Sequence, residues 1–258
     1  MKNIKYDFSG KTVVVTGGVS GIGLAISESF AQAGANVVMC CTPGSKNGKG
    51  AYEKVIAAGG KAILCEVDIS VKEQVEAMYR DAIKAYGKVD ILVSNAAAFD
   101  GYTKLLDTSD ELWQRVMNVN LNGNFYLCKT FIPHFLENKG GVIVFVSSIA
   151  GVIGGHGGAA YTTSKHGLTG LVKELTFDYG REGIRVNAVA PGSTYTPLAA
   201  SALESEKSKK KLSWTPYGTY GQPQFIANEV LYLASDEAEF VYGTVHLCDG
   251  GNAVRKWE

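Results

Sequence analysis

The chain has 258 residues, of which 46% are hydrophobic and 19% charged, and its 25 basic side chains balance 25 acidic ones. This composition excludes a disordered or low-complexity protein, and the charge balance argues against attraction to nucleic acid or an anionic membrane surface. No apolar run approaches the roughly 20 residues of a membrane helix, and the N-terminal stretch lacks a signal-peptide pattern. We therefore expect a cytoplasmic protein whose partner is a small molecule.

Short runs of β-branched residues alternate with segments of helical pattern along the chain. The predicted strands are KTVVVTG, NVVMCC, KAILCEVD, VDILVSN, GVIVFVSS, IRVNAVAPG and GTVHLCDGG. The predicted helices between them include one from about Gly21, one from about Ser70, a long one across Trp113 to Leu136, one that contains Tyr161, and one near Phe225 to Ala234. Strands that are apolar throughout need crossovers and cover on both faces. The pattern predicts an α/β fold, a Rossmann-like doubly wound parallel sheet of seven strands with helices on both faces.

No linker divides this pattern, and every predicted helix is needed to cover one sheet. We therefore expect residues 1–258 to form a single domain. The irregular part, residues 196–222, is expected to be a mobile section. The five cysteines, at positions 40, 41, 65, 128 and 248, show no metal-ligand spacing, so no metal site is expected. Adjacent Cys40 and Cys41 should point to opposite faces of their strand.

In open α/β sheets the ligand binds beyond the carboxyl ends of the strands. The first of these ends reads VTGGVSGIG, in which Gly17, Gly21 and Gly23 permit a tight turn from strand to helix. Such a turn aims backbone amides from a helix N-terminus at a phosphate group. The spacing differs from G-x-G-x-x-G, and its position between the first strand and a helix favours nucleotide binding over simple turn chemistry.

A second motif is AAYTTSKHG, in which Tyr161 and Lys165 are four residues apart. On a helix the two side chains share one face, because the helical repeat brings positions i and i+4 together. A phenol beside an ammonium group can transfer a proton. A free tyrosine has a pKa of about 10, and we expect the Lys165 ammonium to favour the phenolate.

Taken in order, these motifs resemble the short-chain dehydrogenase/reductase family from Lys11 to Gly251. TGGVSGIG is similar to the cofactor glycine motif, the VD pair that ends at Asp68 to the adenine-contacting aspartate, and NVNLNG, VSSIAG and APGSTYT to three further family segments. SNAA stands where the family usually has N-N-A-G, so Ser94 and Ala97 depart from the pattern. Thr194 stands where Val or Ile is common.

The resemblance implies that Tyr161 is the general acid and base of hydride transfer between a nicotinamide cofactor and a carbonyl or alcohol. It further implies that Ser148 holds the substrate oxygen, that Lys165 also bonds the nicotinamide ribose, and that Asn120 anchors a water chain for the proton. The implied cofactor-binding residues are Gly17, Ser20, Gly21, Ile22, Gly23, Thr42, Asp68, Ile69, Asn95, Tyr161, Lys165, Pro191, Thr194 and Thr196.

Several neighbours compete for these roles. Ser147 lies beside Ser148, but only Ser148 has the family spacing from Tyr161, and Asn118 or Asn122 could be mistaken for Asn120. His156 lies at a position that belongs to the wall of the substrate pocket in the family. A lone loop histidine is usually solvated, however, so His156 is left out of the catalytic set. The pocket wall is expected to come from Phe99, Tyr102, the loop Ile149 to His156, Tyr195, Leu198 and Trp214.

The end of the second strand bears on the choice of cofactor. An acidic residue there would bind the ribose 2′-hydroxyl and repel a 2′-phosphate, yet Cys41 stands in that place and Thr42, Ser45 and Lys46 follow. We therefore expect NADP(H) to be favoured over NAD(H). The expected substrate is an apolar or neutral ketone or secondary alcohol, and the alternatives are a 3-oxoacyl thioester reductase and a catalytically silent nucleotide-binding regulator. The resemblance also implies a homotetramer.

Overall fold

The computed structural model describes residues 6–197 and 199–254, and its centre is one parallel sheet. The strands are β1 (Thr12–Val15), β2 (Asn36–Cys41), β3 (Lys61–Glu66), β4 (Ile91–Ser94), β5 (Gly141–Val146), β6 (Ile184–Pro191) and β7 (Val245–Cys248). They are ordered β3-β2-β1-β4-β5-β6-β7, and every neighbouring pair is parallel. The strand order reverses between β1 and β4, where open sheets of this kind bind ligands. The predicted fold class is confirmed.

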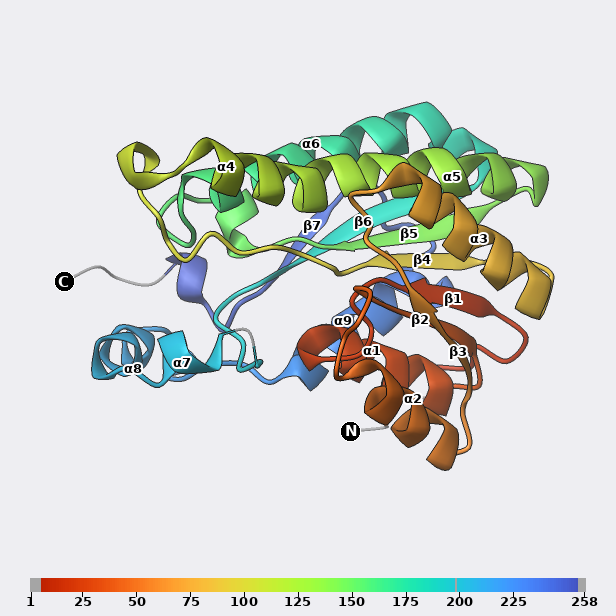
Figure 1. The fold of residues 1–258 in the computed structure, drawn as a ribbon, viewed down its shortest axis with the longest axis horizontal. Helices are drawn as coiled ribbons and strands as arrows, with labels where there is room; N and C mark the ends of the chain where they lie inside the picture. Colours follow the sequence, from red (N-terminus) through yellow and green to blue (C-terminus); the bar gives the residue numbers. More distant parts are fainter. Residues whose placement is uncertain (1–5, 198, 255–258) are drawn as a thin grey trace.

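Helices cover both faces of the sheet (Figure 1). One layer holds α1 (Gly21–Gln32), α2 (Gly48–Ala57) and α9 (Pro223–Ala234), and the other holds α3 (Lys72–Tyr86), α5 (Gly123–Glu137) and α6 (Ala159–Tyr179). Each layer encloses its own apolar core against the sheet. Cys40 packs in one core and Cys41 in the other, which confirms that adjacent residues of β2 point to opposite faces.

The long helix predicted across Trp113 to Leu136 is not regular. It consists of α4 (Asp110–Met117), a π-helical turn at Asn118–Asn122, and α5. Turns of this kind are rare and often occur at functional sites. The apolar pattern predicts a helix on both sides of the turn, but a single extra residue in the repeat cannot be read from that pattern.

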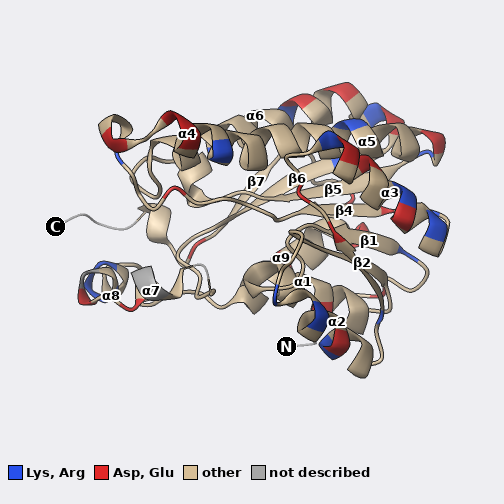
Figure 2. Ribbon diagram, in the orientation of Figure 1, with Lys and Arg blue, Asp and Glu red and all other residues tan. Residues whose placement is uncertain are grey.

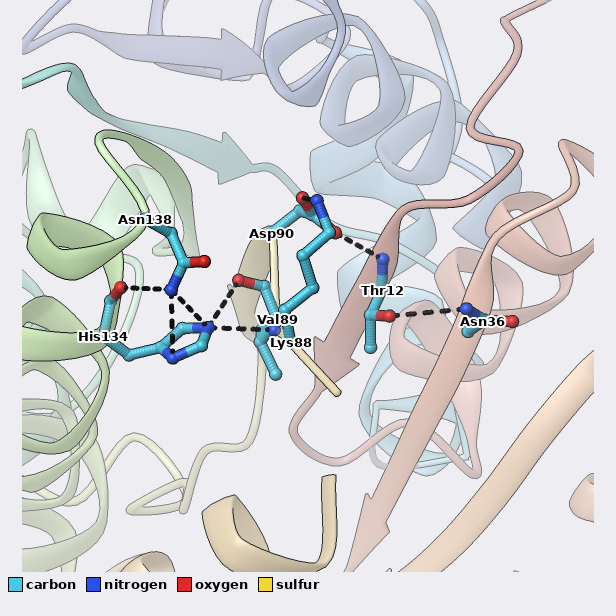
Figure 3. A network of polar contacts seen from close by, with 7 residues as sticks. All are labelled: Thr12, Asn36, Lys88, Val89, Asp90, His134 and Asn138. Atoms are coloured by element: carbon cyan, nitrogen blue, oxygen red, sulfur yellow. Dashed lines mark hydrogen bonds and ion pairs between the residues drawn. The ribbon is translucent and has the colours of Figure 1, made fainter. Parts of the chain in front are cut away.

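Polar contacts join the amino ends of several strands, at the edge opposite to the expected ligand site (Figure 3). The Asp90 carboxylate accepts a hydrogen bond of 2.8 Å from the Thr12 amide and pairs with Lys88 at 2.7 Å. On the α5 side, His134 Nε2 lies 3.1 Å from the Val89 amide nitrogen. These bonds tie β1, β4 and α5 together where no ligand is expected, so this network is structural.

The section after β6 contains two short helices, α7 (Ala200–Leu203) and α8 (Glu206–Ser213), which lie apart from the two helical layers (Figure 1). The basic run of α8 includes Lys209, which pairs with Glu206 at 2.9 Å. Figure 2 shows acidic and basic residues interspersed along the outer helices, while the strands are mostly free of charge. Within the described part of the chain, no helix is long and apolar enough to cross a membrane.

Candidate active site

A cavity of about 390 Å³ opens at the carboxyl edge of the sheet. Its walls come from the segments that follow β1, β2, β4, β5 and β6. Most of the residues predicted from the sequence line it, namely Gly17, Ser20, Gly21, Ile22, Gly23, Thr42, Asn95, Ser148, Tyr161, Lys165, Pro191, Thr194 and Thr196. The fold therefore brings together residues that are up to 179 positions apart, from Gly17 to Thr196.

The glycine turn is built for close backbone approach. Gly17 and Gly21 have φ values of 62° and 51°, which glycine adopts without strain. A β-carbon at Gly23 would overlap the Gly17 carbonyl oxygen and lie 2.5 Å from Asn95 Nδ2. Asn95 in turn donates to the Thr16 carbonyl oxygen at 3.0 Å. The turn leaves room for a phosphate group beside the first amides of α1, so these residues fit a dinucleotide cofactor.

Tyr161 and Lys165 lie in the first two turns of α6, as their spacing predicts. The Lys165 side chain is buried, its Nζ donates to the Val146 carbonyl oxygen at 3.0 Å, and it lies 5.5 Å from the centroid of the Tyr161 ring. Ser148 follows β5, and its Oγ accepts from the Ala150 amide at 3.1 Å. Tyr161 and Ser148 both line the cavity, and the Ser148 side chain acts to lower the pKa of the Tyr161 phenol. One cavity wall thus holds a phenol, a hydroxyl and an amine.

The proton affinities differ from the expectation drawn from the sequence. Burial raises the pKa of Tyr161 to about 12, and the Ser148 side chain only partly opposes this rise. Burial lowers the pKa of Lys165 to about 8. The expectation that the Lys165 ammonium lowers the pKa of Tyr161 is therefore not met in this geometry, because loss of solvation dominates and Ser148 is the group that opposes it. The phenol is neutral, as a proton donor must be.

Asn120 lies in the π-helical turn, fully buried behind the cavity. Its Oδ1 accepts from the Ala98 amide at 2.8 Å, and its Nδ2 donates to the Ala98 carbonyl oxygen at 2.9 Å and to Ser164 Oγ at 3.0 Å. The side chain that was expected to anchor a water chain is thus bonded to protein groups at both ends. It joins the loop after β4 to α6.

Asp68 and Ile69, which were predicted to bind the cofactor, are not among the residues that line the cavity. The Asp68 carboxylate accepts from the amide of Ser70 at 2.9 Å and from its hydroxyl at 2.6 Å. The Ile69 side chain is buried, and it lies where a β-carbon at Gly123 would stand. Both residues occupy the turn before α3, where local bonding predominates.

The two departures from the family pattern differ in their surroundings. Ser94 is buried beneath the cavity, and its hydroxyl donates to Asn124 Oδ1 at 2.5 Å. Ala97 lines the cavity. Ser94 therefore contributes a buried hydrogen bond to the packing beneath the site. Of the two residues, only Ala97 faces the space for a ligand.

The substrate end of the cavity is lined by Phe99, Tyr102, Ile149 and His156, as predicted, and also by Ala199 and Leu203. Tyr195 instead bonds Glu204 at 2.7 Å, and neither it nor Trp214 lines the cavity. Leu198 lies outside the described residues. The sequence did not point to Ala199 and Leu203, because short helices in an irregular section have no clear periodicity.

Comparison with known proteins identifies the family. A family model described as enoyl-(acyl carrier protein) reductase matches residues 17–253. The chain belongs to the short-chain dehydrogenase/reductase family. It is 36% identical to 3beta-hydroxysteroid dehydrogenase 2 of Eggerthella lenta over 248 residues, which cover 94% of this chain and 95% of the relative.

Two further members of the short-chain dehydrogenase/reductase family are similar over almost their whole length. Cyclohexanol dehydrogenase of an Acinetobacter species is 35% identical over 243 residues, which cover 94% of this chain and 95% of the relative. The solved structure of a 7α-hydroxysteroid dehydrogenase complexed with NADH and 7-oxo glycochenodeoxycholic acid is 33% identical, with a TM-score of 0.90 and coverage of 98% of both chains. The present chain is accordingly a nicotinamide-dependent oxidoreductase that interconverts an alcohol and a carbonyl compound.

Proposed function

We propose that Tyr161 is the general acid and base of this reaction, with Ser148 placing the substrate oxygen against the phenol. The observation that carries the proposal is that Tyr161 and Ser148 line the same cavity as the glycine turn, with the Ser148 side chain acting on the phenol. When bound, the nicotinamide supplies or accepts the hydride. During reduction the neutral phenol gives its proton to the carbonyl oxygen, and during oxidation the phenolate takes the proton from the alcohol.

Lys165 is proposed to restore the proton and to bond the nicotinamide ribose. Its amine is buried beside the Tyr161 ring and is supported by the Val146 carbonyl oxygen. A pKa of about 8 lets it give up or accept a proton near neutrality. We propose that Asn120 serves the same proton path, because its side chain holds Ala98 and Ser164 in place. The water chain that carries the proton would begin at those two residues.

We propose an apolar, alicyclic ketone or secondary alcohol as the substrate. The substrate wall consists of aromatic and aliphatic side chains, and among the described residues that line the cavity there is no aspartate, glutamate or arginine. The hydroxysteroid and cyclohexanol activities that name the relatives agree with this wall. A 3-oxoacyl thioester would need a long open channel and a carrier-binding surface in addition.

A substrate panel tests this proposal. Purified protein is given cyclic secondary alcohols, hydroxysteroids and an acetoacetyl thioester, with NAD(H) and NADP(H) in parallel, and turnover is followed by nicotinamide absorbance. We expect kcat/KM to be highest for the alicyclic compounds. Preference for the acetoacetyl thioester would contradict the substrate class, and turnover of none would contradict the catalytic role.

The proposed cofactor preference is NADP(H) over NAD(H). Cys41, Thr42 and Ser45 line the cavity at the end of β2, where the two hydroxyl groups can donate to a 2′-phosphate. Glu66 is the register partner of Cys41 on β3, but it is exposed and is not one of the described residues that line the cavity. Lys46 is exposed on the same loop as Ser45 and adds positive charge there.

Charge substitutions at this loop should change the preference. Cys41→Asp places a carboxylate where it accepts from a ribose 2′-hydroxyl and repels a phosphate, so we expect kcat/KM to shift towards NAD(H) by about tenfold or more. Lys46→Ala should weaken NADP(H) alone. Both variants and the wild type are compared with both cofactors at fixed salt. A wild type that already favours NAD(H), or equal effects of Lys46→Ala on both cofactors, would show that the loop is only a solvated turn.

We propose one domain over residues 1–258, a mobile section at 196–222 that adapts to the substrate, and a cytoplasmic location.

We further propose a homotetramer, supported by exposed apolar side chains such as Phe125 and Leu247 on α5 and β7. Light scattering at micromolar concentration should give four times the chain mass of 27.5 kDa. A monomer under those conditions would contradict the assembly.

A further inference from the structure

The loop after β4 is held firmly against the start of α6. Asp100 is only 3% exposed, and its two carboxylate oxygens accept from the Gly158 amide at 2.9 Å and the Tyr161 amide at 2.8 Å. The Tyr102 amide donates to the same carboxylate at 3.2 Å. Since Gly158 precedes the first turn of α6, Asp100 caps this helix from a segment about 60 residues earlier in the chain.

The fit between loop and helix leaves no space. A β-carbon at Gly158 would lie 2.5 Å from Asp100 Oδ2 and would also overlap the Thr103 carbonyl oxygen. That carbonyl oxygen accepts from the Ala159 amide at 3.1 Å. Tyr102, in the same loop, has a φ of 62°, a backbone conformation that is energetically unfavourable for a residue with a side chain. The surrounding bonds hold the loop in this conformation.

The same loop forms the aromatic wall beside the reacting group. The Phe99 ring meets the Tyr161 ring edge to face, with centroids 5.1 Å apart, and meets the Tyr102 ring in the same way at 4.9 Å. Phe99 and Tyr102 both line the cavity. Asp100 therefore lies at the junction of the substrate wall and the phenol.

We propose that Asp100 is a positioning residue for the reaction, whose carboxylate fixes the Tyr161 phenol against the substrate wall and whose negative charge holds the proton on that phenol. This inference rests on the acid and base role proposed for Tyr161. It assigns to one buried side chain both the orientation of the proton donor and part of its proton affinity.

The charge argument follows from the groups around Tyr161. The donors to Asp100 named above are all backbone amides, and two of them, those of Gly158 and Tyr161, belong to the N-terminus of α6, where the helix dipole attracts negative charge. A nearby anion opposes formation of phenolate. Burial is the largest cause of the raised pKa of Tyr161, and Tyr102 and then Asp100 add smaller increases. The other titratable or charged groups around the phenol and the loop are Lys165 on α6, Tyr102 on the loop, His156 on the cavity wall, and Arg115 on α4, which donates to the Phe99 carbonyl oxygen at 3.4 Å.

The test compares Asp100→Asn with Asp90→Asn. Asp90 also accepts a backbone amide, but it lies at the opposite edge of the sheet (Figure 3), so its substitution should leave the pH profile unchanged. For alcohol oxidation, which requires the phenolate, Asp100→Asn should move the rise of kcat to lower pH by a fraction of a unit. For carbonyl reduction, the fall of kcat should move in the same direction. The value of kcat at its optimum should drop by about tenfold, because the phenol is held less firmly, with a smaller change in KM.

Three outcomes would overturn the proposal: an unshifted pH profile with uniformly lower kcat, an unchanged kcat, or an equal displacement in Asp90→Asn. Asp100→Glu, which keeps the charge, should restore the pH profile. If Asp100→Asn fails to fold, Asp100→Ser supplies a neutral cap and should show the same shift.

A readout independent of turnover separates this inference from the proposed function. The carbon-13 signal of the Tyr161 ring, assigned by its loss in Tyr161→Phe, is titrated in the wild type and in Asp100→Asn. A midpoint that falls in Asp100→Asn supports the role of the charge even if no substrate of the panel reacts. An unchanged midpoint refutes it even if the enzyme is active.

Discussion

Turnover of the Tyr161→Phe variant is expected to fall by about a thousandfold or more, because the substitution removes the transferable proton while the ring remains. The edge-to-face contact with Phe99 should persist, since it involves the ring and not the hydroxyl. Cofactor affinity, measured by fluorescence titration, should therefore change little.

Tyr79→Phe is the matched control for this variant. It removes a hydroxyl that lies 3.2 Å from His134 Nδ1, near the network at the opposite edge of the sheet, and turnover should be retained. Comparable kcat in Tyr161→Phe and the wild type would refute the acid and base assignment.

Replacing Lys165 by methionine should lower kcat by about a hundredfold and also weaken cofactor binding, because the amine serves both the proton path and the ribose. The apolar stem remains in place, so the loss reports the amine itself. Lys129→Met, at an exposed position on α5, is the control and should behave like the wild type. Intact cofactor affinity in Lys165→Met would contradict the dual role.

The same variant should change stability in the opposite direction. The Lys165 pKa is about 8 in the folded protein, below its ordinary value of 10.5, so burial of the charged form costs stability. This cost is fully present below pH 8 and disappears as pH rises through 10.5, because the unfolded chain binds more protons within that window. Chemical unfolding at neutral pH should therefore show a gain of about 1–3 kcal/mol for Lys165→Met, and the gain should shrink at high pH. A loss of stability at neutral pH would contradict this reading.

The sheet and most of the site were predictable because their signals are local. Apolar strands such as Val13 to Val15 and Leu92 to Val93 are buried on both faces, and their alternation with helices determines the parallel topology. The spacing of Tyr161 and Lys165 places both on one face of a helix whatever surrounds them. The glycine turn is equally local, since its positive φ values are a property of the turn.

The features that sequence reasoning missed depend on contacts between distant segments. Asp100 meets the amide of Tyr161 only when the chain is folded, and no local pattern marks an aspartate that caps a remote helix. The raised pKa of Tyr161 likewise depends on burial by the walls of the cavity. The spacing of Tyr161 and Lys165 shows that they are neighbours but does not give the loss of solvation that determines their proton affinities.

The two walls of the substrate cavity differ in how they are attached to the reaction centre. Phe99 and Tyr102 belong to a loop that Asp100 and Thr103 bind to the start of α6, so changes in that wall also disturb the phenol. Ala199 and Leu203 belong to the section with α7. That section contacts the glycine turn at Thr196, which lies against Gly21. Mutant libraries that seek new ketones, or the opposite enantiomer of an alcohol, should therefore be confined to residues 199–203, where selectivity can diversify while the proton machinery stays intact.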